Sequence, residues 1–488
     1  MVQVQIQDIL SMEWLSAPVA TLVAGDPART CRGCVIDSRQ VEPGSIFVAF
    51  PGERVDGNDF ARSAIEAGAA CVALTRAPEP ELISCAEGRG CAVLSIESGE
   101  AFLLALARFW RERLGCTVVG VTGSIGKTTT KDMLAQILST TYRVHATAGN
   151  FNNLIGMPLT ILSAPEDTQV LVLEMGMNTR GEIEQLSRAA RPNIAAITKI
   201  GTSHIGMLGS RENIALAKME ITCGMQPIPE DAEVGKPHAA PVLALPADDD
   251  FFPFLLEHIA DYTPGIEPVR CGAHAGCDYK RGDIALDDEG HPHVSVELPG
   301  CRSLEVALST VGAQTVSNAV LAIAVADRLG VAGEDIVRAL GDLTVTGRRQ
   351  EIRRTATGAR VIDDSYNASP ESMAAALDLL CLLPATGSRI AVLGEIGELG
   401  DEAPRLHELV GAYAAAKELD YLVCVGGEDA RHMARAALLM GLSDDAVLVL
   451  EDTDEAIARL AGIFAQDNVV LVKGSRFVGL DRLVEEVC

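Results

Sequence analysis

The sequence predicts an α/β protein of three domains. Its 488 residues are too many for one hydrophobic core, and a hydrophobic content of 48% allows each of several domains to bury its own. Short apolar runs alternate with longer helical patterns along most of the chain, which is typical of parallel sheets covered by helices. No internal repeat or low-complexity linker interrupts this alternation.

The chain is strongly acidic, with a formal net charge of −27 and a pI near 4.7. This charge opposes nonspecific binding to nucleic acid or anionic membranes, and an anionic substrate would need local basic pockets. The sequence does not open with a basic segment before an apolar core, and it has no run of about 18 apolar residues. We therefore expect a cytoplasmic protein with no nucleic-acid partner and no membrane-inserted segment.

The cysteine pattern favours free thiols. Thirteen cysteines are scattered along the chain, and Cys31 and Cys34 form the only CxxC pair. A structural zinc site normally needs a second such pair, so reduced thiols in a reducing compartment are the simpler interpretation and a zinc site is the alternative.

The first domain is expected over residues 1–112. Apolar runs at 46–49 and 71–74 predict strands around a helix, with turns at proline-glycine pairs. The tripeptide Asp37-Ser38-Arg39 follows a strand and, by itself, is more typical of a surface loop than of a binding site.

The central domain, expected over residues 113–346, begins with VVGVTGSIGKTTT. The run 118–121 predicts a buried strand that leads through a glycine-rich loop into a helix starting at Lys127. Such a loop turns backbone N–H groups onto phosphate oxygens, the lysine supplies a cation, and the next hydroxyl can bind Mg²⁺. Val121 stands where the common pattern has glycine, and a plain strand-to-helix turn is the alternative. The expected nucleotide contacts are Thr122, Gly123, Ser124, Ile125, Gly126, Lys127, Thr128 and Thr129.

Three further polar residues of this domain follow predicted parallel strands. Glu174 ends the run 170–173, His204 follows the run 194–197, and Lys218 lies on a predicted helix over 211–222. Singly, these could be a helix cap, a loop histidine and a solvated lysine. Because ligands gather where parallel strands end, their convergence beside the phosphate loop predicts a Mg²⁺–phosphate site.

The pattern loosens over residues 224–297, where the triplet Asp248-Asp249-Asp250 occurs together with several prolines, among them Pro227, Pro229, Pro237, Pro241 and Pro246. We expect an insertion that covers one edge of the central domain, with the acidic triplet simply solvated. Regular helix is expected again over 314–329, with Asn318 at a position where an apolar residue would pack better.

The third domain is expected over residues 347–488 as a Rossmann-like, doubly wound α/β unit. Its predicted strands are 359–362, 390–393, 421–425, 446–450 and 469–472. Their ends carry a polar cluster formed by Asp364, Asn367, Glu395 and Lys473.

Taken in order, the phosphate loop and six further motifs resemble those of the Mur ligases from about Val35 to the C-terminus. The motifs are TAGNFNNLIGMPLT, LEMGMNTRGEI, IGTSHIGMLGSRENIALAKMEI, DDSYNASPESM, VLGEIGELG and VLVKGSR. DDSYNASP and VLVKGSR favour the branch that adds D-alanyl-D-alanine to UDP-N-acetylmuramoyl-tripeptide over the branch that adds the third amino acid.

The resemblance implies a role for each domain and residue. The first domain would bind the uridine nucleotide, the second would act as the ATPase, and the third would close on the second during ligation. The implied substrate contacts are Ser38, Arg39, Asn152, Asn153, Asn367 and Lys473, and the implied ATP contacts beyond the loop are Asn318 for adenine, Asp364 for ribose and Arg348 for the transferred phosphate. Thr128 and Glu174 would bind one Mg²⁺, and His204 with Lys218, as a carbamate, a second.

The resemblance also implies the reaction. A peptide carboxylate would attack the γ-phosphate of ATP, and the amine of the dipeptide would attack the resulting acyl phosphate, with Lys127, Glu174, His204, Lys218 and Arg348 as the catalytic set. Such an enzyme works in peptidoglycan precursor synthesis, here expected as a monomer. The alternatives are another Mur-type amide ligase, such as the third-residue enzyme, cyanophycin synthetase or folylpolyglutamate synthase, or a P-loop switch.

The chain departs from the family pattern at three positions. Gln314-Thr315 replaces a frequent His-Asn, Thr179 replaces a histidine, and Gly206 stands where an acidic residue is common. These departures concern base and second-metal binding and leave the expected reaction class unchanged.

Overall fold

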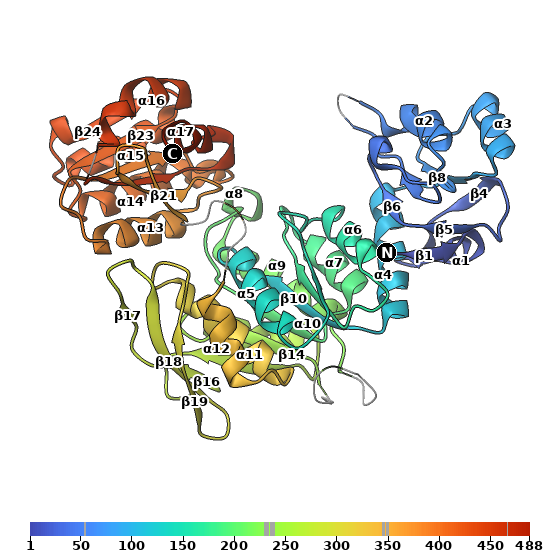
Figure 1. The fold of residues 1–488 in the computed structure, drawn as a ribbon, viewed down its shortest axis with the longest axis horizontal. Coiled ribbons are helices and arrows are strands. Elements are labelled where there is room, and N and C mark those ends of the chain that lie inside the picture. Colours follow the sequence, from blue (N-terminus) through green and yellow to red (C-terminus); the bar gives the residue numbers. More distant parts are fainter. Residues whose placement is uncertain (53–54, 229–233, 235–239, 344–346, 348–350, 466) are drawn as a thin grey trace.

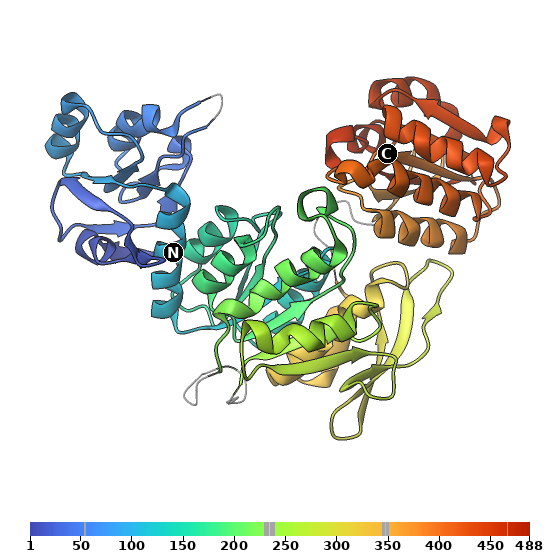
Figure 2. The same ribbon diagram turned by 180° about the vertical axis from the view of Figure 1, so that it is seen from behind.

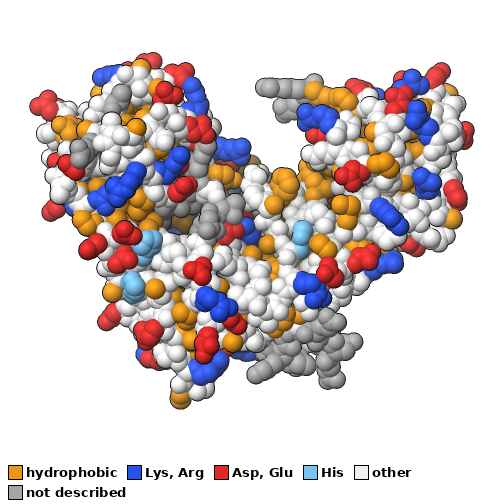
Figure 3. All heavy atoms as spheres, viewed as in Figure 1, with side chains coloured by type: hydrophobic (Ala, Val, Ile, Leu, Met, Phe, Trp, Pro, Cys, Tyr) orange, Lys and Arg blue, Asp and Glu red, His pale blue; other side chains and the backbone are white. Residues whose placement is uncertain are grey.

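The computed structural model describes residues 1–52, 55–228, 234, 240–343, 347, 351–465 and 467–488. Three α/β domains form a V, with the central domain at its base and the N-terminal and third domains as its arms (Figures 1 and 2). The space-filling view is hollowed between the two arms (Figure 3). Within the described ranges, none of the helices combines the length and apolarity that crossing a bilayer requires.

The N-terminal domain is built on a five-stranded sheet of order β4-β9-β8-β7-β6, in which only the β4–β9 pair is antiparallel. Two small antiparallel pairs, β1–β5 and β2–β3, accompany it. Its elements are β1 (Gln3–Gln5), α1 (Ile6–Leu10), β2 (Glu13–Trp14), β3 (Ala17–Pro18), β4 (Thr21–Ala24), β5 (Thr30–Arg32), β6 (Cys34–Val35), β7 (Ile46–Val48), α2 (Ala61–Glu66), β8 (Cys71–Leu74), α3 (Pro80–Arg89) and β9 (Ala92–Ser95).

Helix α4 (Gly99–Leu114) joins this sheet to the central domain. Its Trp110 donates Nε1–H to the carbonyl of Ala164 at 3.3 Å, and the buried Arg111 donates to the carbonyls of Ala190 and Arg191. The helix therefore packs on the central domain, and the expected boundary at residue 112 falls in its last turn.

The central domain contains a ten-stranded sheet of order β11-β12-β10-β13-β14-β15-β16-β18-β17, with β19 on β18. Its elements are β10 (Thr117–Thr122), α5 (Lys127–Ser139), β11 (Val144–Ala146), α6 (Gly156–Ser163), β12 (Val170–Glu174), α7 (Glu182–Ala190), β13 (Ile194–Ile197), α8 (Ile205–Leu208), α9 (Arg211–Met219), β14 (Val242–Pro246), α10 (Phe252–Tyr262), β15 (Glu267–Gly272), β16 (Tyr279–Arg281), β17 (Ala285–Leu286), β18 (Pro292–Leu298), β19 (Arg302–Ala307), α11 (Thr315–Arg328) and α12 (Gly333–Gly341).

The parallel strands of this sheet are buried on both faces. In β10, Val118 packs into one core with Trp110 of α4, whereas Val119 and Val121 pack into a second core with Leu134 of α5. Successive side chains of a strand point to opposite faces, so a continuous apolar run needs helices on both sides. This arrangement holds the carboxyl ends of β10, β12 and β13 at one edge of the sheet.

The expectation of an insertion over 224–297 is wrong. Strand β14 pairs in parallel with β13, β15 with β14 and β16 with β15, which extends the central sheet. Strand β18 then pairs antiparallel with β16, β17 and β19. The prolines misled the prediction because Pro241 directly precedes β14 and Pro246 is its last residue, where a missing N–H is tolerated.

The acidic triplet is not merely solvated, as expected from the sequence. Asp248 pairs with Arg281 at 3.0 Å, and Asp249 accepts the backbone N–H groups of Ile200 and Phe251. Asp250 pairs with both terminal nitrogens of Arg211 at 2.7 Å. The triplet therefore ties the end of β14 to the loop after β13, to α9 and to β16, mainly through partners that lie far away in the sequence.

The third domain is the expected doubly wound unit. Its six-stranded sheet has the order β20-β21-β25-β22-β23-β24, parallel except for β20. Its elements are β20 (Glu351–Arg354), β21 (Arg360–Asp364), α13 (Pro370–Leu382), β22 (Arg389–Gly394), α14 (Ala403–Ala415), β23 (Tyr421–Val425), α15 (Glu428–Leu439), β24 (Val447–Leu450), α16 (Thr453–Leu460), β25 (Val469–Lys473) and α17 (Asp481–Val487). The expected boundary at 346/347 adjoins residues 344–346, outside the described part.

Candidate active site

The loop from β10 to α5 forms a tight cradle at the edge of the central sheet. Gly123 and Gly126 have φ of +143° and +89°, and a Cβ on either would lie 2.0 Å from Oγ1 of Thr198 or 2.4 Å from Oδ1 of Asn318. Only glycine fits this backbone and this space. Lys127 starts α5, and its Nζ lies 2.8 Å from the carbonyl of Gly123. The helix N-terminus and this ammonium provide the donors that a polyphosphate needs.

Glu174, at the end of β12, is held beside the first turn of α5. The Thr128 hydroxyl donates to its Oε2 at 2.7 Å, and Nδ2 of Asn152 donates to its Oε1 at 2.8 Å. A buried carboxylate next to a threonine hydroxyl is a donor set that suits Mg²⁺. His, Cys, Asp and Glu side chains of the described residues nowhere gather as a group of three that could bind a metal, so these residues would hold the ion together with phosphate oxygens.

Lys218 lies fully buried beneath this edge, on α9. Its Nζ has no hydrogen-bond partner within the described part of the chain. Burial, and secondly the charge of Lys127, hold the pKa of Lys218 well below its usual range. Glu174, Glu182 and Glu220 act in the opposite direction without forming a contact to it. The side chain is therefore suited to be a neutral amine.

The loop after β13 contacts the third domain. Nδ1 of His204 lies 2.6 Å from Oε2 of Glu398, and this imidazole lowers the pKa of Glu398. Both residues have left-handed backbones, with φ of 66° and 65°, a conformation that costs a non-glycine residue ~1–3 kcal/mol. Strained residues of this kind cluster at functional sites.

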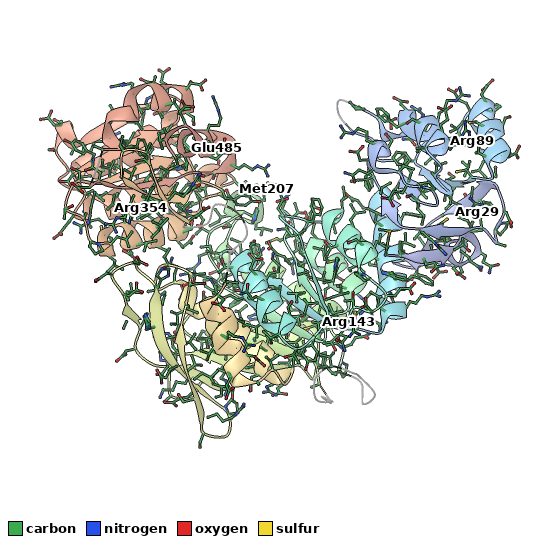
Figure 4. All side chains as sticks on the ribbon, in the orientation of Figure 1. Arg29, Arg89, Arg143, Met207, Arg354 and Glu485 are labelled. Carbon is green, nitrogen blue, oxygen red and sulfur yellow. The ribbon has the colours of Figure 1, made fainter. Side chains whose placement is uncertain are left out.

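Two further contacts strengthen this docking. Glu371, in the first turn of α13, accepts the N–H of Thr202 at 2.8 Å and its hydroxyl at 3.2 Å. Gly206 donates its N–H to the carbonyl of Glu398 at 3.1 Å. Met207, next along α8, stands at the tip of the central domain beside the third domain (Figure 4). Glycine at position 206, one of the departures from the family pattern, is thus explained by the close approach of the two domains.

The facing edge of the third domain carries a buried ion pair. Lys473, the last residue of β25, donates to Oδ2 of Asp364 at 2.7 Å and to the carbonyl of Asn367 at 2.9 Å. Register places Asp364 and Lys473 side by side at the ends of parallel strands. Glu395 was predicted to join this cluster. Its carboxylate instead accepts the backbone N–H of Ala430, in the first turn of α15.

One cleft of about 1030 Å³ unites the central and third domains. The predicted residues that line it are Ser124, Ile125, Gly126, Lys127, Thr128, Thr129, Asn152, Asn153, Glu174, His204, Asn318, Asp364, Asn367 and Lys473. Thr122, Gly123 and Lys218 belong to the same region but do not line the cleft. Arg348 lies outside the described residues.

Ser38 and Arg39 lie apart from this cleft, in the N-terminal domain. They belong to a short 3₁₀ helix, and Arg39 is 87% exposed. Its guanidinium pairs with Asp37 at 2.7 Å and lowers the pKa of that carboxyl to about 2. The loop therefore presents a preformed arginine at the surface of one arm.

Sequence reasoning missed Lys199, Glu371 and Glu398. Lys199 and Glu371 line the cleft, and Glu398 contacts His204. Glu371 and Glu398 fall inside quoted motifs and Lys199 directly precedes one, so nearness to a motif was the available signal, but their partners belong to other strands and another domain. Of the remaining departures, Gln314 lines the cleft and Thr179 donates its hydroxyl to Glu182.

The chain matches three domain families. They are the Mur ligase family catalytic domain at residues 30–110, the Mur ligase middle domain at 121–326 and the Mur ligase glutamate ligase domain at 348–476. It is 37% identical to the UDP-N-acetylmuramoyl-tripeptide–D-alanyl-D-alanine ligase of Bacillus subtilis (strain 168), over 93% of each chain.

The fold of this chain is also similar to those of solved Mur ligase structures. A crystal structure of MurF from Acinetobacter baumannii has a TM-score of 0.83 at 30% identity and covers 99% of this chain and 97% of its own. MurF ligase from Thermotoga maritima in complex with ADP has a TM-score of 0.78 at 28% identity, over 93% and 96%. Domain by domain, in sequence and in fold, this chain belongs to the Mur ligase family.

Proposed function

We propose that this chain joins D-alanyl-D-alanine to UDP-N-acetylmuramoyl-tripeptide with consumption of ATP, in cytoplasmic peptidoglycan precursor synthesis. The observation that carries the proposal is the cleft in which a phosphate loop of the central domain faces the polar strand ends of the third domain. The relatives that span nearly the whole chain bear the name of this activity. Because one chain supplies both sides of the cleft, a monomer is sufficient for the reaction.

The residues of the cleft fit ATP and Mg²⁺. The backbone of the phosphate loop, Lys127 and the start of α5 would hold the phosphates, with Asn318 next to the loop for the base. Thr128 and Glu174 would bind one metal ion, and His204 with Lys218 a second. When bound, Mg²⁺ would offset the negative charge that builds up during phosphoryl transfer.

The third domain would complete the site. Lys473 holds the Asp364 carboxylate in place, and this carboxylate would accept a hydrogen bond from a ribose hydroxyl. Asn367 belongs to the same cluster. Arg348 is proposed to contact the transferred phosphate. Because an acyl phosphate hydrolyses in water, the closure of this domain over Asn152 and Asn153 would keep the reacting carboxyl dry.

Lys218 is proposed to act as a carbamate. A neutral amine reacts with CO₂ to give an N-carboxylate and one proton, and burial keeps this amine neutral. The product would place an anionic oxygen, the ligand type that Mg²⁺ prefers, on the arm of a residue whose Nζ has no other partner within the described chain.

The N-terminal domain, residues 1–112, is proposed to bind the uridine nucleotide through Ser38 and Arg39. A pyrophosphate ligand needs a local cation in a chain of net charge −27, and Arg39 is exposed for this role. The substrate would then reach from this arm to Asn152 and Asn153 in the cleft.

A product assay tests the function. Purified protein, ATP and Mg²⁺ are mixed with D-alanyl-D-alanine and UDP-N-acetylmuramoyl-tripeptide, and mass spectrometry looks for the pentapeptide. Formation of ADP and pentapeptide in equal amounts is expected, with no ADP when either substrate is omitted. ATP hydrolysis that ignores both substrates would favour the P-loop switch, and product with a single amino acid would favour another Mur-type ligase.

A further inference from the structure

Lys199 lies directly beside the phosphate loop. It follows β13, and its carbonyl accepts the N–H of Ser124 at 2.7 Å, in an antiparallel bridge between residues 125 and 199. The preceding Thr198 donates its N–H to the carbonyl of Thr122 at 2.9 Å and its hydroxyl to that of Ile125. The backbone of Lys199 is thus fixed to the loop at several points.

The side chain of Lys199 belongs to the cleft. It lines the same cavity as Ser124, Lys127 and Thr128, and its surface is exposed. Within the described residues it has neither a hydrogen bond nor an ion pair. A long cationic side chain is therefore available at the rim of the phosphate cradle.

The two acidic residues whose pKa Lys199 influences have other partners. Asp250 is paired with both terminal nitrogens of Arg211, and Asp249 accepts two backbone N–H groups. Burial raises the pKa of Asp249 and the hydrogen bond from Arg211 lowers that of Asp250, whereas Lys199 is the weakest of the named influences on either group. Neutralising this pair is therefore not the main role of Lys199.

We propose that Lys199 is a further phosphate-binding cation of the nucleotide site, acting from the loop after β13 as Lys127 acts from α5. A bound polyphosphate would bring several negative charges next to a chain of net charge −27, and a fixed cation beside the loop offsets them. The inference rests on the proposed function only for nucleotide binding at this loop, and not for the ligation that follows.

Binding of ATP and ADP to full-length protein, followed by titration calorimetry, tests the inference. Lys199→Gln should weaken both affinities roughly tenfold, or about 1.4 kcal/mol, because it removes a charge-assisted contact between an ammonium and a phosphate. Lys199→Arg should stay close to wild type and Lys199→Glu should fall below Lys199→Gln. The loss in Lys199→Gln should shrink at high salt, since screening weakens an exposed charge. Lys280→Gln is the matched control and should bind normally, because it removes a surface lysine of β16 that pairs with Glu297 of β18.

Equal affinities of Lys199→Gln and wild type would overturn the assignment, as would an Arg variant as weak as the Gln variant. A rise confined to the KM for the dipeptide, with nucleotide affinity unchanged, would assign Lys199 to the acceptor instead and also overturn it. Wild-type protein that binds ATP but forms no pentapeptide would refute the ligase function, while the comparison of the Lys199 variants would still stand.

Discussion

Gly206→Ala should act as a wedge between the central and third domains. The φ of Gly206 is not in the left-handed region, so alanine can adopt its backbone and the effect is purely one of space. A Cβ at this position would lie 2.5 Å from the nitrogen of Gly400, 2.8 Å from the carbonyl carbon of Leu399 and 2.9 Å from the oxygen of Glu398. All three are backbone atoms, which cannot rotate away.

The clash is comparable in size to the contacts that hold the docked arrangement. Overpacking of this kind costs ~1–3 kcal/mol. Against it stand the hydrogen bond from Gly206 to Glu398, of about 1 kcal/mol, and those from Thr202 to the charged Glu371, of about 1.5–3 kcal/mol. A net loss of about 1.4 kcal/mol reduces the equilibrium constant between the docked and undocked arrangements roughly tenfold.

Small-angle X-ray scattering of the nucleotide-free protein measures this change. Gly206→Ala should have a larger radius of gyration than wild type, while each domain keeps its far-ultraviolet circular dichroism. Gly276→Ala is the control, because a Cβ there meets nothing within 4 Å and its φ is also not left-handed. Superimposable scattering curves for Gly206→Ala and wild type would show that the docked arrangement tolerates the extra methyl and that the steric reasoning is wrong.

Three further substitutions test the site. Lys127→Ala should reduce ATP turnover on the order of 10³-fold without unfolding the protein, since its ammonium contacts loop carbonyls rather than the core; a tenth of wild-type activity would contradict this. Arg39→Ala should raise the KM for the uridine nucleotide far more than the KM for ATP, and equal changes in both would show that the loop at residues 37–39 is an ordinary surface loop and not a binding site. Lys218→Ala should be nearly inactive and regain part of its activity with millimolar acetate, whereas rescue by an alkylamine instead would show that a cation was needed.

The sequence by itself determined the fold class and the strand-linked motifs. Buried parallel strands need continuous apolar runs, and these placed β10, β12 and β13 within a residue or two of their observed bounds. The glycines and Lys127 of the phosphate loop could be identified because their spacing encodes a local backbone shape. A local structure of this kind depends only on residues that are close together in the sequence, so the sequence alone can predict it.

Only the tertiary structure decided which distant residues meet. The extension of the sheet by β14 and β15, the partners of Asp248, Asp249 and Asp250, and the contacts of His204 with Glu398 and of Thr202 with Glu371 all join segments far apart in the chain. The burial of Lys218, which makes its amine neutral, likewise depends on the packing of several elements around it. Local patterns specify each strand and helix. Burial and charge at the site depend instead on which strands are neighbours in the sheet and on how two domains dock.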